Sequence, residues 1–183
     1  MEPYKTIAYS ETTLTELMVP SYSNFGGKIH GGVILSLMDK VAYVCAAKHA
    51  DAYCVTASID TVDFLAPVEV GELVSLLASV NYVGRSSLVI GIKVISENIK
   101  THEVKHTNTS YFTMVAFDED NKTVQVPGLI LQNDEQVRRF YEAFQLKELK
   151  KKYKQEAAIK KTIKTTAEYL AFIQNERFRM AES

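Results

Sequence analysis

The stretch from Gly31 to His49, GGVILSLMDKVAYVCAAKH, constrains the fold of this chain more than any other part of the sequence. It predicts a helix that is apolar on nearly every side, and such a helix has to be covered all round. A single carboxylate, Asp39, stands in its middle, where a charge is costly unless it is paired or hydrogen-bonded. We therefore expect a central helix whose one acidic residue needs a physical explanation.

Long strands are predicted after this helix, because β-branched and aromatic residues dominate there. They cover the segments 53–67, 71–83, 84–99 and 104–118. The second and third meet at Gly84, which predicts an antiparallel hairpin, and a further strand is expected before the helix at 6–19. Because strands and helices do not alternate, we expect an α+β protein with an antiparallel sheet wrapped on the helix.

Such a sheet covers the helix from one side only. The rest of an almost entirely apolar helix then needs a second surface, and a dimer partner is the economical answer.

The character of the chain changes from Asn133 onward. Apolar residues such as Val137, Tyr141 and Phe144 recur at helical spacing, which predicts two helices or one long kinked helix. Residues 141–183 carry ten Lys and Arg against six Asp and Glu. This charge is typical of a solvated helix face, with an anionic ligand, a membrane surface or a partner as alternatives. We divide the chain into domains 1–132 and 133–183.

Overall composition excludes several classes of function. The net charge of the 183 residues is -1, so no field for nucleic acid is implied. No apolar run reaches the roughly 18 residues typical of a membrane span, and the first residues lack the layout of a signal peptide. We expect a cytoplasmic protein without integral membrane contact, in which Cys45 and Cys54 are buried free thiols.

Two motifs are misleading. The run from His102 to His106 matches the zinc-protease pattern His-Glu-x-x-His, which works only on a helix. It lies in strand and turn sequence, where residues four apart are separated by about 13 Å and cannot share a metal. The glycines before Lys28 do not form a phosphate-binding P-loop, because Ile29 follows the lysine where that motif needs a serine or threonine.

Asp39 has two explanations. In the structural one it pairs with Lys40, or lies on a polar stripe with Ser36 and Lys40. In the functional one it works with the turn GGKIHGG, whose backbone N–H groups at a helix N-terminus form a site for an oxyanion. Asn24, just upstream, is placed to orient a water or a carbonyl. A base, an oxyanion site and an orienting amide are the parts of a hydrolytic site.

Geometry constrains this second explanation. Gly31 and Asp39 are eight residues apart, or about 12 Å along a helix. A scissile carbonyl needs both groups within about 3 Å, so one helix cannot supply both. If they cooperate, the aspartate comes from a second protomer.

Four segments carry a family resemblance. They are NFGGKIHGGVILSLMDKVAYVCAAKH, VTASIDTVDFLAPVEVGE, VGRSS and SYFTMVAFDEDNKTVQVP, in this order. Together they resemble the hotdog-fold acyl-CoA thioesterases over roughly residues 7–127, and are most similar to the group of the bacterial acyl-CoA hydrolases and the mammalian brain-type enzyme. The resemblance implies a hotdog fold, here with an extra C-terminal helical segment. It also implies paired protomers, commonly assembled as a trimer of dimers.

The resemblance further implies a catalytic site at the dimer interface. One chain would contribute Asn24 with the Gly31–Gly32 turn, and the other Asp39 as general base or nucleophile. The turn of Gly84, Arg85, Ser86 and Ser87 is similar to the segment that contacts the CoA nucleotide. The strand carrying Thr56 and Ser58 is similar to the one beside the pantetheine channel. The chain departs from the family at Lys40, because an acidic residue is common at this position in its members.

These features lead to the expectation of an enzyme that hydrolyses fatty acyl-CoA to a fatty acid and CoA. A thioester is already reactive, so a positioned base and an oxyanion site suffice, and no metal or cofactor is expected, CoA being part of the substrate. The alternative is a non-catalytic acyl-CoA sensor with the basic tail as its partner-binding element. A third option, dehydration, would use His30.

Overall fold

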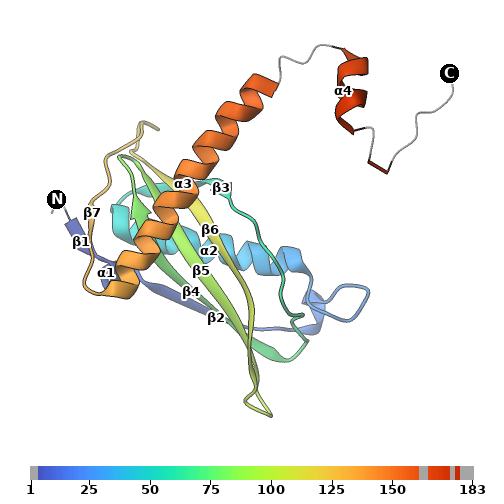
Figure 1. Cartoon of the computed structure of the whole chain (residues 1–183). Helices are drawn as coiled ribbons and strands as arrows, with labels where there is room; N and C mark the ends of the chain where they lie inside the picture. The colour runs from blue at the N-terminus through green and yellow to red at the C-terminus, as the bar shows by residue number, and fades with distance from the viewer. Residues whose placement is uncertain (1–3, 161–164, 174–175, 178–183) are drawn as a thin grey trace. The chain divides into compact units, whose positions relative to one another are not determined.

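The computed structural model describes residues 4–160, 165–173 and 176–177 (Figure 1). The elements are β1 (Tyr4–Thr6), α1 (Ile7–Ser10), β2 (Thr12–Leu17), a short 3-10 turn η1 (Pro20–Tyr22), α2 (Gly31–Ala50), β3 (Tyr53–Ile59), β4 (Glu72–Val83), β5 (Ser87–Asn98), β6 (Val104–Phe117), β7 (Gly128–Ile130), α3 (Asp134–Lys160) and α4 (Thr166–Ile173). Among the described helices, none is long and apolar enough to cross a membrane.

Five antiparallel strands form the main sheet, in the order β2-β4-β5-β6-β3. β4 and β5 form the hairpin that the sequence predicts around Gly84. Along these long strands alternate side chains face α2, and most of these inward residues are apolar. β1 and β7 form a separate two-stranded parallel sheet.

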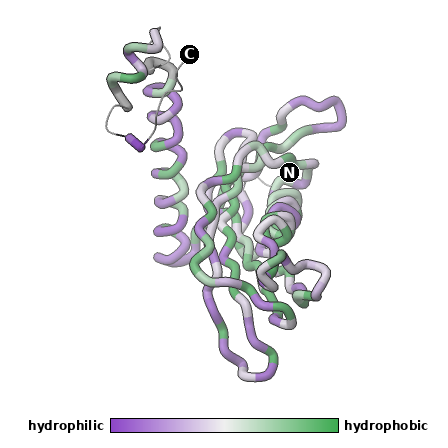
Figure 2. Tube along the Cα trace, turned by 90° about the vertical axis from the view of Figure 1, so that its right-hand side faces the viewer, coloured by the Kyte–Doolittle hydropathy of each residue, from purple (hydrophilic) through white to green (hydrophobic). Residues whose placement is uncertain are grey.

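α2 lies across this sheet and forms the core with it (Figures 1 and 2). Met38, Val41 and Cys45 are completely buried against the strands. The opposite side of α2 is exposed and carries Asp39 and Tyr43. The sheet therefore covers the helix from one side, as the sequence predicts, and the second side is open in the single chain.

The other face of the sheet is covered by the first turns of α3 (Figure 2). Tyr82 of β4 stacks on Phe140 and Phe144, and Ala143 is fully buried. The Asn133 side chain caps α3 by accepting from the Gln136 N–H over 3.0 Å. The chain forms two compact units that divide after Phe144. The domain boundary expected between residues 132 and 133 stays a prediction.

Two expected strands are shorter than their composition predicts. In 6–19 only Thr12–Leu17 is a strand of the main sheet, because residues 7–10 form a helical turn with Ile7 and Ser10 buried. In 53–67 the strand ends at Ile59, and residues 60–71 form an extended connection. The tail forms two helices in its described part, as expected.

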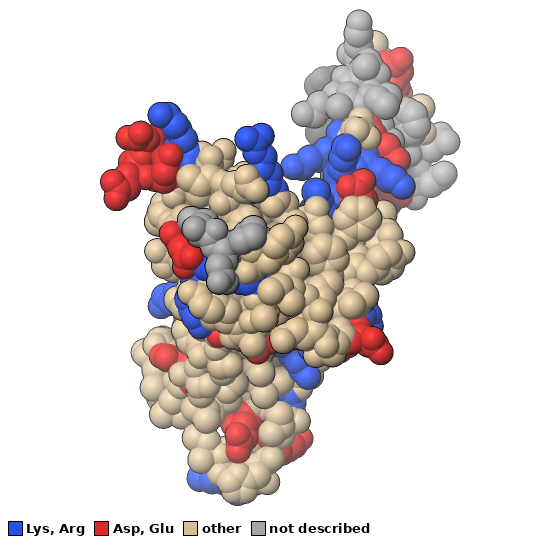
Figure 3. All heavy atoms as spheres, turned by 90° about the vertical axis from the view of Figure 1, so that its left-hand side faces the viewer, with Lys and Arg blue, Asp and Glu red and all other residues tan. Residues whose placement is uncertain are grey.

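Other expectations are confirmed. Cys45 and Cys54 are buried free thiols, and burial raises the pKa of Cys45 to about 12. His102 lies in a turn with a φ of 58°, whereas His106 lies on β6, so the His-Glu-x-x-His match is not helical. Acidic and basic side chains are interspersed on the face shown in Figure 3, without a large field of one sign.

Candidate active site

The loop before α2 is shaped by Asn24. Its side-chain Oδ1 accepts hydrogen bonds from the N–H groups of Gly26 over 2.9 Å and Lys28 over 3.2 Å. Gly27 has a φ of 75°, a conformation that favours glycine. The oxygen of Asn24 is thus committed to the loop, and its NH₂ group is the part of the side chain that can reach a substrate.

The N-terminus of α2 is capped by His30, which the sequence did not single out as a cap. Its Nδ1 accepts from the Gly32 N–H over 2.9 Å, so Nε2 carries the proton in the neutral ring. This bond removes the Gly32 N–H from the pair that the sequence suggests for an oxyanion. Among the described residues, no hydrogen bond engages the Gly31 N–H.

Asp39 lies on the exposed side of α2, next to β3. Thr56 donates its hydroxyl hydrogen to Asp39 Oδ1 over 2.6 Å, and its oxygen also lies 3.3 Å from Met114 Sδ. Lys40 is exposed and forms no ion pair within the described residues. The carboxylate is therefore positioned by a threonine from the neighbouring strand and not by Lys40.

An irregularity in β3 lies next to this threonine. Thr56 pairs with Met114 and Ser58 with Thr113, so Ala57 is an extra residue in the register. A bulge of this kind re-aims the side chains beside it and is common next to active sites. Sequence reasoning assigned Thr56 and Ser58 to CoA contacts and missed the bond from Thr56 to Asp39. Nothing in the local composition marks the bulge.

The backbone of the turn between β4 and β5 is held by hydrogen bonds. Gly84 N–H donates to Ser87 O over 2.7 Å, while the carbonyls of Arg85 and Ser86 accept from Val126 and Ala116 over 2.9 Å each. The Arg85 side chain is exposed. A guanidinium on a fixed turn is suited to bind a phosphate.

The register relates this turn to β3, the strand that carries Thr56. Ser87 lies opposite Val115 of β6, which lies opposite Val55 of β3. Two strand spacings, about 10 Å, therefore separate the start of β5 from the residue before Thr56. Ser58 is exposed on β3, at the edge of the sheet. The structure thus brings the two groups of predicted CoA contacts to the same end of the sheet but not into contact.

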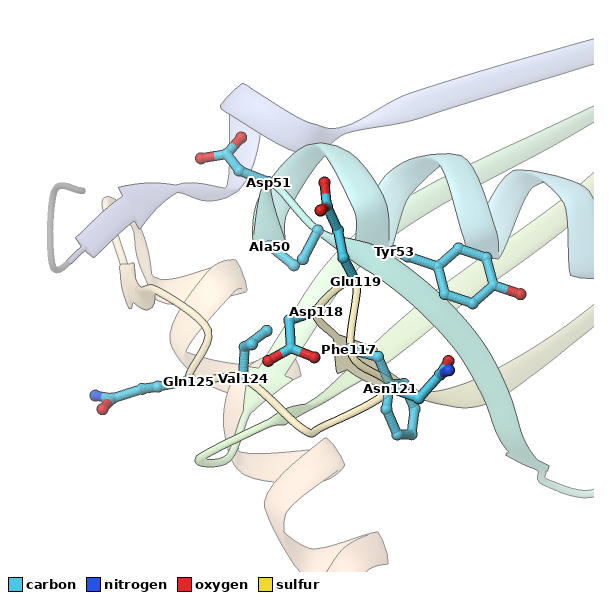
Figure 4. A pocket seen from close by; sticks show the side chains of 10 residues that line it. Ala50, Asp51, Tyr53, Phe117, Asp118, Glu119, Asn121, Val124 and Gln125 are labelled. Carbon is cyan, nitrogen blue, oxygen red and sulfur yellow. The ribbon is translucent and has the colours of Figure 1, made fainter.

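Two hollows in the described part of the chain lie elsewhere. One, of about 640 Å³, lies at the C-terminal end of α2 between Asp51, Phe117 and Val124 (Figure 4). The other, of about 660 Å³, lies on the sheet face next to α3. Neither contains Asn24, Gly31 or Asp39. Asn24 and Asp39 are exposed in the single chain, and Gly31 is partly exposed.

Comparison with known proteins gives one family. Residues 26–102 match the sequence model of the thioesterase superfamily. The Helicobacter pylori protein VdlD is 45% identical over 137 residues, which cover 75% of this chain and 78% of that protein. The Bacillus subtilis acyl-CoA thioester hydrolase YkhA, itself uncharacterized, is 36% identical over 70% of this chain and 74% of its own length. The rat cytosolic acyl coenzyme A thioester hydrolase is 30% identical, and the match spans only 36% of it.

Solved structures that are similar to this chain belong to the same family. A hexameric acyl-CoA thioesterase superimposes with a TM-score of 0.80 at 37% identity, covering 84% of this chain and 97% of that one. An acyl-CoA hydrolase from Staphylococcus aureus, solved with butyryl-CoA and CoA, gives 0.79 at 31% identity over 92% and 99%.

Three further structures of the Staphylococcus protein carry an alanine in place of one aspartate, one threonine or one asparagine. In that protein the aspartate follows the asparagine by fifteen positions and precedes the threonine by seventeen. The same two spacings separate Asn24, Asp39 and Thr56 in this chain.

Proposed function

The chain belongs to the thioesterase superfamily, and on this premise we propose that it is an acyl-CoA hydrolase that releases a fatty acid and CoA. The observation that carries the proposal is the trio Asn24, Asp39 and Thr56. It has the spacing of the three residues replaced in the Staphylococcus hydrolase, and Thr56 holds Asp39 through a hydrogen bond of 2.6 Å. A non-catalytic acyl-CoA sensor would have no need of a carboxylate held in this way.

Asp39 is the reacting carboxylate in this proposal. As a general base it takes a proton from water while the water oxygen adds to the thioester carbonyl carbon. The tetrahedral intermediate then collapses, the carbon–sulfur bond breaks, and the CoA thiolate takes up a proton. As a nucleophile the carboxylate would instead form an acyl anhydride that water hydrolyses. In both routes Thr56 orients the carboxylate and no metal or cofactor takes part.

The negative oxygen of the intermediate is bound by the backbone N–H of Gly31. The start of a helix favours negative charge there, and the neighbouring Gly32 N–H is occupied by His30. Asn24 supplies a second donor through its NH₂ group. His30 caps the helix through Nδ1, and the proposed hydrolysis assigns no catalytic role to its ring.

The complete site requires two protomers. Asp39 is about 12 Å from Gly31 along α2, so the Asp39 of one chain meets the Asn24 and Gly31 of another. The exposed side of α2 and the edge strand β3 are the surfaces that join them. A trimer of such dimers would match the hexameric thioesterases among the structural neighbours.

Arg85 and the turn around it would bind the phosphates of CoA, with Gly84, Ser86 and Ser87 as donors beside it. Thr56 and Ser58 lie on the strand that would line the pantetheine arm. We place the enzyme in the cytoplasm, the compartment for which the rat, mouse and human relatives are named.

The test is thiol release from acyl-CoAs of two to sixteen carbons, measured with a thiol reagent. We expect release by the wild type and a loss of more than about a thousandfold in kcat for Asp39→Asn. Thr56→Val removes the donor at constant shape and should lower kcat by about ten- to a hundredfold, with Thr56→Ser restoring it.

The matched control is Asp134→Asn, the same replacement at an exposed carboxylate on α3, which should leave kcat unchanged. Full activity in Asp39→Asn would refute the assignment of the reacting carboxylate. Tight binding of a CoA ester without any release would favour the sensor instead.

A further inference from the structure

The connection between β3 and β4, residues 60–71, runs beside the first turn of α2 (Figure 1). We call it the strap. Its backbone is tied to β6 by hydrogen bonds from Asp60 N–H to Tyr111 O over 2.9 Å and from Leu65 N–H to Thr107 O over 2.8 Å. Its far end is tied to the loop before α2, because Val68 O accepts from Ile29 N–H over 2.9 Å.

A second set of contacts fixes the end of the strap. Lys28 and Glu69 form both an isolated β-bridge and an ion pair. Lys105 of β6 pairs with the buried Glu72 over 2.6 Å and lies 3.3 Å from the carbonyl of Pro67. The strap is thus held at both ends by the sheet and by the loop that carries Asn24. These ties position the backbone of the strap relative to α2.

Phe64 is the side chain that this arrangement brings onto the candidate site. A Cβ added at Gly31 would lie 3.1 Å from Phe64 Cζ, 3.5 Å from Cε2 and 3.7 Å from Cε1. The tip of the ring therefore rests against the bare side of Gly31, whose N–H is the proposed oxyanion donor. Phe64 is nevertheless 51% exposed, so the ring forms a wall and is not part of the core.

We propose that Phe64 determines which acyl groups the enzyme accepts, by excluding those that are branched at the carbon next to the thioester carbonyl. This inference rests on the proposed hydrolase function. A carbonyl oxygen bound by the Gly31 N–H lies about 3 Å from that nitrogen, and the acyl α-carbon is two bonds beyond the oxygen. A methyl branch on that carbon competes with the ring for the same space. An unbranched acyl chain extends from that carbon in a single direction and avoids the ring.

The experiment compares kcat/KM for butyryl-CoA and isobutyryl-CoA. We expect the wild type to prefer the straight chain by about ten- to two-hundredfold, the range that one misplaced methyl group gives in a tight pocket. Phe64→Ala should reduce this ratio at least about tenfold, mainly through a gain on isobutyryl-CoA, and Phe64→Leu should give an intermediate ratio.

The matched control is Leu65→Ala. Leu65 is the next residue on the strap and is 66% exposed, so its truncation should leave the ratio unchanged. A ratio that stays the same in Phe64→Ala, or an equal loss on both substrates, overturns the inference while leaving the hydrolase intact. A wild type that releases thiol from no CoA ester overturns both.

A second measurement tests the contact itself. Gly31→Ala places a methyl group against the ring but keeps the backbone N–H, so it should lower kcat/KM for butyryl-CoA. The double variant Gly31→Ala with Phe64→Ala removes the clash and should recover activity. Thermal unfolding of each variant identifies any that fails to fold, and a double variant as impaired as Gly31→Ala in its folded form contradicts the proposed contact.

Discussion

At the scale of single residues, His49 is a titratable group that is built into the interior of the protein. It is fully buried at the end of α2, and its partners define its tautomer. Nε2 donates to Pro127 O over 3.1 Å, because a carbonyl only accepts, and Nδ1 accepts from the Ser10 hydroxyl over 3.3 Å. The ring therefore joins α2 to α1 and to the segment before β7 while it is neutral.

Stability should depend on pH through this ring. Burial lowers the pKa of His49, the nearby Lys5 lowers it further, and the carbonyl of Pro127 and Asp51 oppose the shift only in part. The unfolded chain then binds a proton more readily than the folded one. The contribution of His49 to the free energy of unfolding is thus fully present above about pH 6.5. It is lost as the pH falls from there toward the lower pKa of the folded state.

Urea unfolding between pH 7.5 and pH 5 measures this effect. The wild type should lose up to about 1.4 kcal/mol of unfolding free energy per pH unit within the window, and His49→Gln, which keeps a donor for Pro127 O, should show a flatter profile. His102→Gln replaces a histidine whose side chain is 78% exposed and should keep the wild-type slope. Equal slopes in wild type and His49→Gln would remove His49 as the cause.

The candidate site could be predicted from the sequence only where single residues carry the chemistry. Asp39 is conspicuous because a carboxylate in an apolar helix is costly, and the glycines before the helix mark an anion site. The bond from Thr56 to Asp39 lies beside the bulge at Ala57, and the cap by His30 uses a residue that is not a usual N-cap. Both arise from backbone geometry that residue types do not specify.

At the scale of elements, the long periodic segments follow the sequence and the irregular ones do not. α2 and the β4–β5 hairpin begin and end within a few residues of the predicted bounds. In both, the hydrophobic periodicity and the turn residues indicate the same bounds. The strap has the composition of a strand, with Val62, Phe64 and Leu65 close together, but it leaves the sheet after Ile59. Its apolar side chains are better explained by contact with a substrate or a second chain than by the core.

The ion pair that fixes the end of the strap should matter for stability. Glu72 has a side chain that is only 4% exposed. Burial raises its pKa, but the bond to Lys105 and the Glu69 N–H outweigh this, so its net pKa lies below the ordinary value. Lys105→Met leaves this charge buried without its cationic partner and should cost roughly 3–5 kcal/mol of unfolding free energy in urea.

Two variants control this measurement. Lys122→Met removes an exposed ion pair with Asp120 and should change the free energy of unfolding by less than about 1 kcal/mol. Glu72→Gln combined with Lys105→Met removes both charges and should recover part of the loss. A Lys105→Met protein as stable as the wild type would mean that the pair does not hold the strap.

At the scale of the whole molecule, the open side of α2 and the edge strand β3 form one surface of the single chain. Among the described strands β3 pairs with β6 alone, so it ends the main sheet on this side. Tyr43 of α2 and Tyr53 of β3 are exposed and stack edge to face with their ring centroids 6.2 Å apart. An edge strand beside exposed aromatic rings is suited to bind a second copy of the chain. Such a copy would also cover the exposed side of α2, as the sequence predicts.

A mixing experiment tests whether the two copies share a site. A protomer with Asp39→Asn still offers Asn24 and Gly31, and a protomer with Asn24→Ala still offers Asp39. If each site takes Asn24 from one chain and Asp39 from the other, a mixed dimer contains one intact site and one with both defects. Because the interface is symmetric and half of randomly formed dimers are mixed, co-expression should restore about a quarter of wild-type activity.

The control is the doubly substituted chain, Asn24→Ala with Asp39→Asn, co-expressed with either single variant. In these combinations no site has both residues, so activity should stay at the level of the inactive variants. If the site is built within one protomer, the first mixture also stays inactive, because every chain then carries a defect in its own site. Activity near zero in that mixture, with the mixed dimers verified by differential tagging, would place Asp39 and Asn24 in one chain and contradict the 12 Å argument from the pitch of α2.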